Sequence, residues 1–184
     1  MKLVHILSAL ILVFFACTPQ ADNHNNEQEV HQTAETKATK AVAEVMSPGD
    51  QDIRGTVTFE KAEDGVLVKG EFYGLEAGKH GFHIHQYGDC TAEDGSSAGG
   101  HYSPRNNDHG SPTQDNRHMG DMGNLVAVAG EIATIDYTDP HINIDNIIGR
   151  GIILHAGEDD LESQPSGAAG SRIACGVIGI AQEK

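Results

Sequence analysis

Short runs of apolar residues, several of them alternating with polar ones, fill most of the chain from residue 53 onward. Within residues 53–59, Ile53, Val57 and Phe59 alternate with polar side chains, which is the period of a half-buried strand. Seven further short apolar runs follow: "GVLVKGEFYG", "HGFHIHQ", "NLVAVAG", "EIATID", "HINI", "IIGRGIILHA" and "IACGVIGIA". Eight short strands without a convincing amphipathic helix predict an all-β fold, either an antiparallel sandwich or a closed barrel.

Two long segments interrupt this pattern. Residues 89–123 and 156–171 are rich in Gly, Ser, Asp and Pro and follow neither the helical nor the strand period. Loops of this length are rare in compact domains unless something organises them or they carry function. We therefore expect two long functional loops.

The N-terminus has the pattern of an export signal. Residues 1–17 combine Lys2, a short apolar stretch and a terminal Cys17, and Ala16–Cys17 resembles a bacterial lipoprotein cleavage site. We expect a lipidated Cys17 and a membrane-anchored protein of the periplasm or cell envelope, with an ordinary cleaved signal or an uncleaved anchor as alternatives. Residues 18–40 contain hardly any large apolar side chains and predict a disordered polar tether. Residues 41–184 form the folded domain.

Charge and cysteine content narrow the class of protein. The chain has 12 basic and 27 acidic residues and a formal net charge of −15, which disfavours nucleic acid and anionic lipid surfaces as partners. Export exposes thiols to an oxidising environment. If Cys17 is lipidated or removed, Cys90 and Cys175 remain as a candidate disulfide pair, with two free thiols as the alternative.

Histidines gather where the strand pattern gives way to the first long loop. His83 and His85 stand at i and i+2, so on a strand they project from the same face. The loop then offers three imidazoles and one carboxylate, a four-coordinate group suited to Zn²⁺. This zinc set consists of His101, His109, His118 and Asp121.

A second group of donors involves the strand histidines. His155 ends the apolar run "IIGRGIIL", where a strand would deliver it to the same rim as His83 and His85. Imidazole-rich sites without thiolate suit Cu²⁺ as well as Zn²⁺. Spacing alone does not choose between these metals.

Six segments together resemble the copper/zinc superoxide dismutase family. They are "GFHIHQYGD", "AGGHYSP", "HGSP", "RHMGDMGNL", "IIGRGIILHAGEDDL" and "GSRIACGVIGIAQ", and the resemblance covers residues 41–184. It implies an eight-stranded antiparallel Greek-key β-barrel or sandwich of immunoglobulin-like architecture. It further implies one copper and one zinc ion per subunit, with His101 as a bridging imidazolate. The copper set it implies consists of His83, His85, His101 and His155.

The resemblance also assigns roles to residues around the metals. Asp159 matches an outer carboxylate that orients one histidine of each metal, and Arg172 matches an arginine beside the copper that attracts the anionic substrate. His80 matches a structural, hydrogen-bonding histidine. The family pairing of Cys90 with Cys175 is implied too, although Cys90 follows "GD" directly, earlier than in the cytosolic animal enzymes. Residues 156–171 lack the lysines with which family members steer superoxide.

The implied activity is the conversion of two superoxide anions and two protons to O₂ and H₂O₂, with Arg172 and His101 as the catalytic residues. A dismutase-like copper carrier is the alternative, but such proteins commonly lose a copper ligand or the arginine. A zinc hydrolase is less compatible, because neither set has a general base beside an open position. The segment "GVIGIAQ" resembles a dimer-contact segment and favours a homodimer over a monomer.

Overall fold

The computed structural model describes residues 37–48 and 51–183, whose strands form a β-barrel. Residues 1–17, including Cys17, and nearly all of the predicted tether lie outside these ranges. The strands are β1 (Lys40–Met46), β2 (Arg54–Ala62), β3 (Gly65–Tyr73), β4 (Gly78–His85), β5 (Asp121–Ala127), β6 (Ala133–Asp139), β7 (Gly151–His155), β8 (Arg172–Val177) and the short β9 (Gly179–Ile180).

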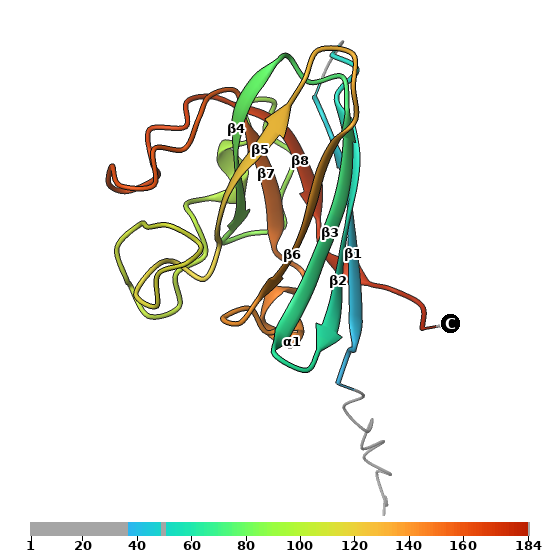
Figure 1. Cartoon of the computed structure of the whole chain (residues 1–184), viewed down its shortest axis with the longest axis vertical. Helices are drawn as coiled ribbons and strands as arrows, with labels where there is room; N and C mark the ends of the chain where they lie inside the picture. The colour runs from blue at the N-terminus through green and yellow to red at the C-terminus, as the bar shows by residue number, and fades with distance from the viewer. Residues whose placement is uncertain (1–36, 49–50, 184) are drawn as a thin grey trace, which may run out of the picture. The chain divides into compact units, whose positions relative to one another are not determined.

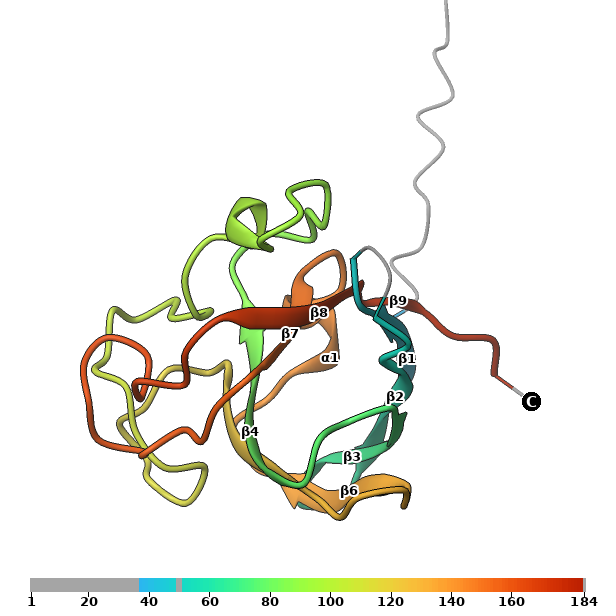
Figure 2. The same ribbon diagram turned by 90° about the horizontal axis from the view of Figure 1, so that it is seen from above.

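The first eight strands form one antiparallel sheet in the order β5-β4-β7-β8-β1-β2-β3-β6. The sheet curls until its edge strands β5 and β6 approach one another, which gives the nearly closed ring seen from above in Figure 2. The predicted all-β class is therefore confirmed, and the order is consistent with a Greek-key barrel. No helix in the described ranges is long and apolar enough to cross a membrane.

Aromatic and branched side chains fill the inside of the barrel. Phe59, Phe72 and Phe82 are fully buried, and the rings of Phe72 and Phe82 meet edge to face with 5.5 Å between centroids. The ring of Phe72 lies over Gly55, where an added Cβ would come within 2.3 Å of it. Gly55 thus occupies an inward position without a side chain because a neighbouring ring fills that space.

Strand β4 is buried on both of its faces. Phe82 and Ile84 point into the apolar core, whereas His83 and His85 alternate with them and project to the outside of the barrel. The two long connections, residues 86–120 and 156–171, cover that outer face, and Figure 1 shows them extending from the same side of the barrel. The barrel wall therefore supplies two histidines, and the loops enclose them.

One predicted strand is wrong, and one strand was not predicted. The segment "HINI" is not a strand, because Asp139 accepts hydrogen bonds from the backbone of His141 and Ile142 and turns the chain there. Asn143 then caps the short helix α1 (Ile144–Ile147). A strand that the pattern did not predict, β1, begins at Lys40, at the end of the predicted tether.

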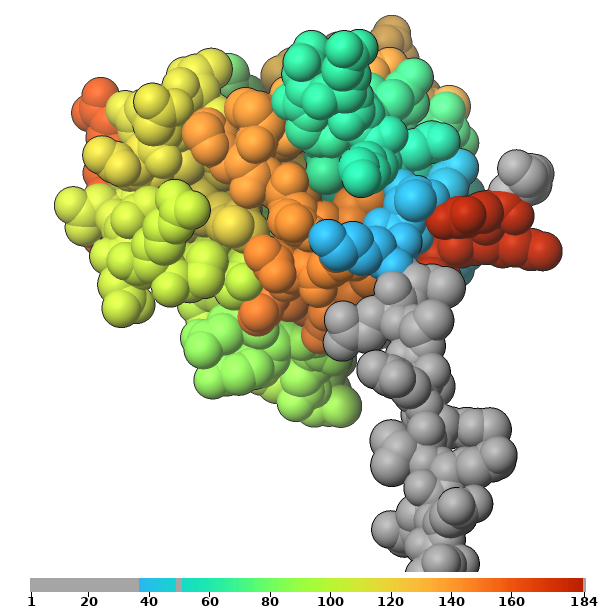
Figure 3. All heavy atoms as spheres, turned by 90° about the horizontal axis from the view of Figure 1, so that it is seen from below, coloured from blue at the N-terminus to red at the C-terminus, as the bar shows by residue number. Residues whose placement is uncertain are grey.

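The end of the chain returns to its first strand. Gly179 and Ile180 of β9 pair with Val42 and Ala41 of β1, and Figure 3 shows the blue and dark red segments side by side. The predicted disulfide is present and joins Cys90 to Cys175 on β8 across 85 residues. It ties the start of the first long loop to the barrel wall.

Candidate metal centre

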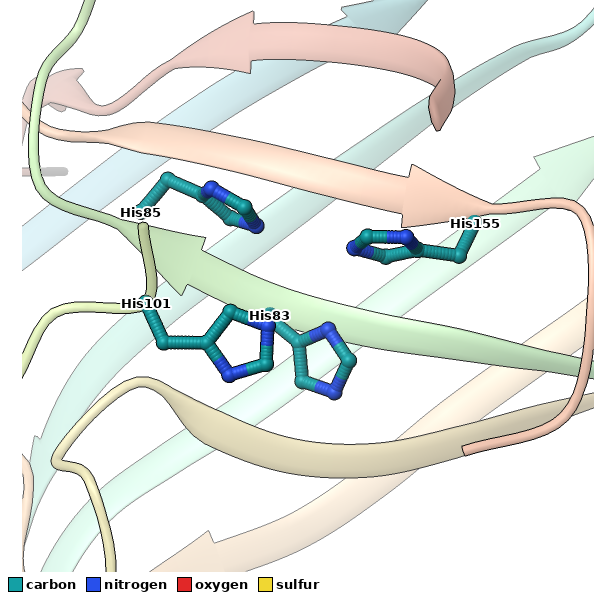
Figure 4. Close-up of side chains that lie close together, drawn as sticks. All are labelled: His83, His85, His101 and His155. Atoms are coloured by element: carbon teal, nitrogen blue, oxygen red, sulfur yellow. The ribbon is translucent and has the colours of Figure 1, made fainter. Parts of the chain in front are cut away.

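The copper set converges on the outer face of β4. His83 and His85 project from β4, His155 ends the neighbouring β7, and His101 enters from the first loop, where it forms an isolated bridge with His85. Figure 4 shows the four rings turned toward a common space. One donor atom from each ring lies within 4.8 Å of the others.

One ring nitrogen of every member of the copper set is buried and has no hydrogen-bond partner. The four atoms are His83 Nδ1, His85 Nε2, His101 Nε2 and His155 Nε2. A buried polar atom without a partner is costly, and four such nitrogens that face one space form a donor set that a cation would bind. Four imidazole nitrogens without thiolate suit copper.

The opposite nitrogen of each ring fixes its tautomer. His85 Nδ1 donates to the carbonyl oxygen of Gly99 at 2.9 Å, and His155 Nδ1 donates to that of Gly170 at 3.2 Å. A proton on Nδ1 leaves Nε2 with a free lone pair. Both rings are thereby held in the form that binds a metal through Nε2.

The zinc set converges on a single carboxylate oxygen. Asp121 Oδ1 lies 2.8 Å from His101 Nδ1, 2.9 Å from His109 Nδ1 and 3.1 Å from His118 Nδ1. Its second oxygen accepts the backbone N–H groups of Gly110 and His118, which fixes the carboxylate. Three imidazoles and one carboxylate at such short separations fit a tetrahedral zinc ion.

His101 belongs to both sets. Its Nδ1 faces Asp121 and its Nε2 is one of the four unpartnered nitrogens. The geometry therefore gives one ring a donor atom toward each group. Asp159 makes a second link between the sets, because its carboxylate contacts His83 Nε2 at 2.7 Å and His109 Nε2 at 2.9 Å.

Burial keeps the copper set neutral in the metal-free protein. It lowers the pKa of His83 to about 3, that of His85 to about 2 and that of His155 to about 4. Burial also lowers the pKa of His101, against the opposing effect of Asp121. Imidazoles must be deprotonated to bind metal, so these rings need lose no proton at neutral pH.

The zinc set has the opposite electrostatic balance. Burial acts to lower the pKa of His109, but its hydrogen bonds with Asp121 and Asp159 outweigh burial and raise the pKa to about 9. Burial would raise the pKa of the Asp121 and Asp159 carboxyl groups, but hydrogen bonds from their histidine partners hold each pKa well below its usual range. Without metal, this group is a network of carboxylates and an imidazolium.

Arg172 stands at the start of β8, beside the copper set. Its guanidinium donates to the carbonyl oxygens of Gly95 and, at 2.7 Å, Gly99. Gly99 is also the acceptor for His85, so one carbonyl group separates the arginine from a member of the copper set. The disulfide at Cys175 holds the same strand against the loop that carries these glycines.

A family model described as "Copper/zinc superoxide dismutase (SODC)" matches residues 53–178. The chain is 40% identical over 190 residues to an extracellular superoxide dismutase [Cu-Zn] of Brugia pahangi, across 95% of this chain and 94% of that protein.

The chain belongs to the copper/zinc superoxide dismutase family. An extracellular relative from Drosophila melanogaster is 44% identical over 155 residues, across 77% of this chain and 85% of that protein. Among solved structures, the crystal structure of the clock protein EA4 aligns with a TM-score of 0.73 and 40% identity, covering 79% of this chain and 97% of that chain. Proteins of this dismutase family use copper and zinc, which the two sets fit.

The comparisons bear on the expected localisation only in part. The two curated relatives named above are extracellular proteins of eukaryotes, which together with the disulfide supports export. They give no support to a bacterial, lipoprotein-like form of the dismutase. Cys17 itself lies outside the described residues.

The predicted residue His80 lies next to the copper set, and two further residues contact His109 and Asp159. His80 is buried, and its ring nitrogens lie 2.9 Å and 3.0 Å from the carbonyl oxygens of His155 and Glu76. Sequence reasoning missed two amides that contact the site, Asn124 and Gln164. Neither is a metal donor, so no ligand spacing could reveal them.

Proposed function

We propose that this protein is an exported superoxide dismutase, which converts two superoxide anions and two protons to O₂ and H₂O₂. The observation that carries the proposal is the set of four buried, unpartnered imidazole nitrogens beside a positioned arginine. The family membership of the chain supports the same reaction.

The metals fit two distinct donor groups. His83, His85, His101 and His155 would hold copper, whereas His101, His109, His118 and Asp121 would hold zinc. When bound, copper supplies one-electron redox chemistry and zinc supplies a fixed positive charge. Asp159 orients His83 and His109 by accepting a hydrogen bond from the ring nitrogen that faces away from each metal.

Arg172 binds and orients the substrate anion. Its guanidinium keeps its charge at any physiological pH and is held in place by two carbonyl oxygens. Because one acceptor, Gly99, is shared with His85, an anion on the outer face of the guanidinium would lie next to the copper set. Fixed positive charge there concentrates superoxide at the site.

His101 handles a proton. Its Nε2 is buried and has no acceptor within the described residues, whereas its Nδ1 is held by Asp121. When Nε2 is not bound to a metal, a proton on it would lie in the same space as the substrate anion and could be donated to that anion. Its buried surroundings exclude bulk water as a competing donor.

Metal analysis combined with a dismutase assay tests the proposal. We expect the full chain to retain one copper and one zinc ion and to remove superoxide rapidly only when copper is present. Copper retained at full occupancy without dismutase activity would contradict the proposal and favour a copper carrier.

Anchoring through Cys17 is the second part of the proposal. The support is the apolar stretch that ends in Ala16–Cys17 and the tether that follows it. A Cys17→Ser variant should move from the membrane fraction to the soluble fraction while keeping its activity. Wild-type protein whose mature N-terminus, by mass spectrometry, carries no acyl chain at Cys17 would refute the anchor and leave export intact.

A homodimer is the third part. In the segment "GVIGIAQ", Val177 and Ile180 are exposed, and the exposed fraction of Ile180 is 70%. Met46 on the adjacent β1 is exposed as well. Exposed apolar side chains on neighbouring strands favour a self-complementary two-fold contact. Light scattering should give twice the chain mass for the wild type and a monomer for Ile180→Glu. A monomeric wild type would refute it.

A further inference from the structure

Gln164 joins the second long loop to the first. Its side-chain carbonyl oxygen accepts the backbone N–H of His109 at 2.8 Å, and its NH₂ group donates to the backbone carbonyl oxygen of His109 at 2.9 Å. The two contacts fix which end of the amide is oxygen, because an N–H must meet an acceptor and a carbonyl must meet a donor. One side chain thus satisfies both backbone groups of His109.

No strand supports the backbone at this point. In residues 37–48 and 51–183, Gln164 is the only hydrogen-bond partner found for the backbone N–H and carbonyl of His109. A strand neighbour would normally provide such a pair of bonds. The amide therefore replaces a strand neighbour for a residue in an irregular loop.

A second amide makes the same kind of contact on the other side. Asn124 of β5 accepts the backbone N–H of Asp159 and donates to its carbonyl oxygen, each at 2.8 Å. His109 and Asp159, whose backbones are held in this way, contact each other through Nε2 and Oδ1 at 2.9 Å. Each loop is thus held by a side chain from outside itself where the two loops meet.

Space around this contact is tight. A Cβ added at Gly167 would come within 1.8 Å of Asp159 Oδ1 and 2.6 Å of His109 Nε2. The His109 ring is therefore packed against Gly167 and cannot move toward it without displacing it. Movement would instead change the direction of the His109 ring relative to Asp121.

We infer that Gln164 is a positioning residue for zinc: by holding the backbone of His109, it directs that ring's Nδ1 into the zinc set. The inference rests on the proposed role of His109 as a zinc ligand. Outer hydrogen bonds to metal ligands typically change metal affinity by about 10- to 100-fold. Because Gln164 is exposed and lies outside the barrel core, we expect its substitution to leave the barrel intact.

Zinc release from the metal-loaded protein tests the inference. Gln164→Met keeps the length of the side chain and removes both hydrogen bonds to His109, together with the 3.2 Å hydrogen bond that the amide donates to the carbonyl oxygen of Glu162. Gln51→Met, an exposed position in the turn between β1 and β2, is the matched control. We expect Gln164→Met to transfer zinc to an excess of a coloured chelator about 10-fold faster or more, with copper release unchanged. Gln164→Glu keeps only the acceptor for the His109 N–H. Its rate of zinc release should therefore lie between those of the wild type and Gln164→Met.

Three outcomes would overturn the inference. Zinc release from Gln164→Met at the wild-type rate would show that the amide does not position His109. Equal acceleration of zinc and copper release, with a lower unfolding temperature of the metal-free variant, would show general loosening of the loop instead. A wild-type protein that retains no zinc would refute the assignment of His109, and the inference with it, independently of any dismutase activity.

Discussion

Individual side chains in this protein combine a buried position with one hydrogen bond that sets their chemistry. His85 donates one ring proton to Gly99 and leaves the other nitrogen unpartnered, and His155 does the same through Gly170. Arg172 donates a hydrogen bond to the same carbonyl oxygen of Gly99. Backbone carbonyl groups, which carry no sequence signal, therefore orient the functional side chains.

Arg172→Ala should reduce dismutase activity by about tenfold or more without loss of metal, because it removes the fixed charge that concentrates the anion. Activity and metal content should be measured on the same sample. Arg172→Lys should recover part of the activity, since the charge remains but the two-point hydrogen bonding is lost. Loss of copper in proportion to activity would mean that Arg172 supports the site rather than the substrate.

At the scale of elements, the barrel was predictable and its first strand was not. Alternation in residues 53–59 and the later apolar runs predicted the sheet, but "KAVAEVM" follows a polar tether and its strand state depends on pairing with β2 and β9. The run "HINI" looks like a strand, yet Asp139 and Asn143 redirect it through local hydrogen bonds. Tertiary pairing and side-chain caps decided both cases.

The members of the two metal sets were predictable because ligand types and spacing are chemical requirements. The contacts of Asp159 were predictable only from the family resemblance. The hydrogen bonds between Gln164 and the backbone of His109 were predictable neither from ligand spacing nor from the resemblance. Two loops far apart in sequence meet there, and the meeting depends on their three-dimensional course. Local patterns carry no information about it.

The second loop is predicted to steer superoxide weakly. Its acidic residues include Glu162, whose exposed side chain makes no described hydrogen bond or ion pair, whereas Glu158 is paired with Lys79 at 2.6 Å. Glu162→Lys should raise the rate by about twofold or more at low salt and by less above about 0.1 M, where charges are screened beyond about 10 Å. Glu63→Lys, the same change in the turn between β2 and β3, is the control. An equal increase for both variants would refute a local effect.

The wild-type rate should also fall as salt is added, because metals and Arg172 attract the anion despite the acidic loop. Measuring activity between low and physiological ionic strength checks this. A rate that rises with salt would mean that the field at the site is repulsive.

The disulfide should stabilise the barrel by restricting the unfolded chain. Removing it in a Cys90→Ser/Cys175→Ser variant should lower the free energy of unfolding by about 2–5 kcal/mol. Denaturant unfolding of the metal-free proteins measures this without the contribution of the metals. A loss below about 1 kcal/mol would mean that the 85-residue link constrains little.

In the domain as a whole, metal binding is coupled to folding. The barrel core is apolar, but the outer face of β4 buries two histidines, each with one ring nitrogen that has no partner within the described residues. Metals would supply the missing bonds, and their binding energy then adds to folding. The loops, which lack an apolar core of their own, depend on that contribution most.

The metal-free protein should lose stability as the pH falls from about 6.5 toward 4. His83, His85 and His155 have pKa values of about 3, 2 and 4 when folded, against an ordinary 6.5, so the unfolded chain binds more protons in this range. His109, with a pKa of about 9, acts oppositely: its stabilisation is full below 6.5 and is lost as the pH rises through 9. Unfolding temperatures should therefore peak near pH 6.5. A flat profile from pH 7 to 5 would contradict this balance.

If His101 serves both metals, its two ring nitrogens bind zinc and copper at once. A crystal structure of the metal-loaded protein, with anomalous scattering recorded at the copper and zinc absorption edges, tests it directly. We predict a zinc peak about 2.0–2.1 Å from His101 Nδ1 and a copper peak at comparable bonding distance from its Nε2. A single metal at His101, or two peaks of which one lies beyond bonding distance of that ring, would show that His101 does not bridge the two metals.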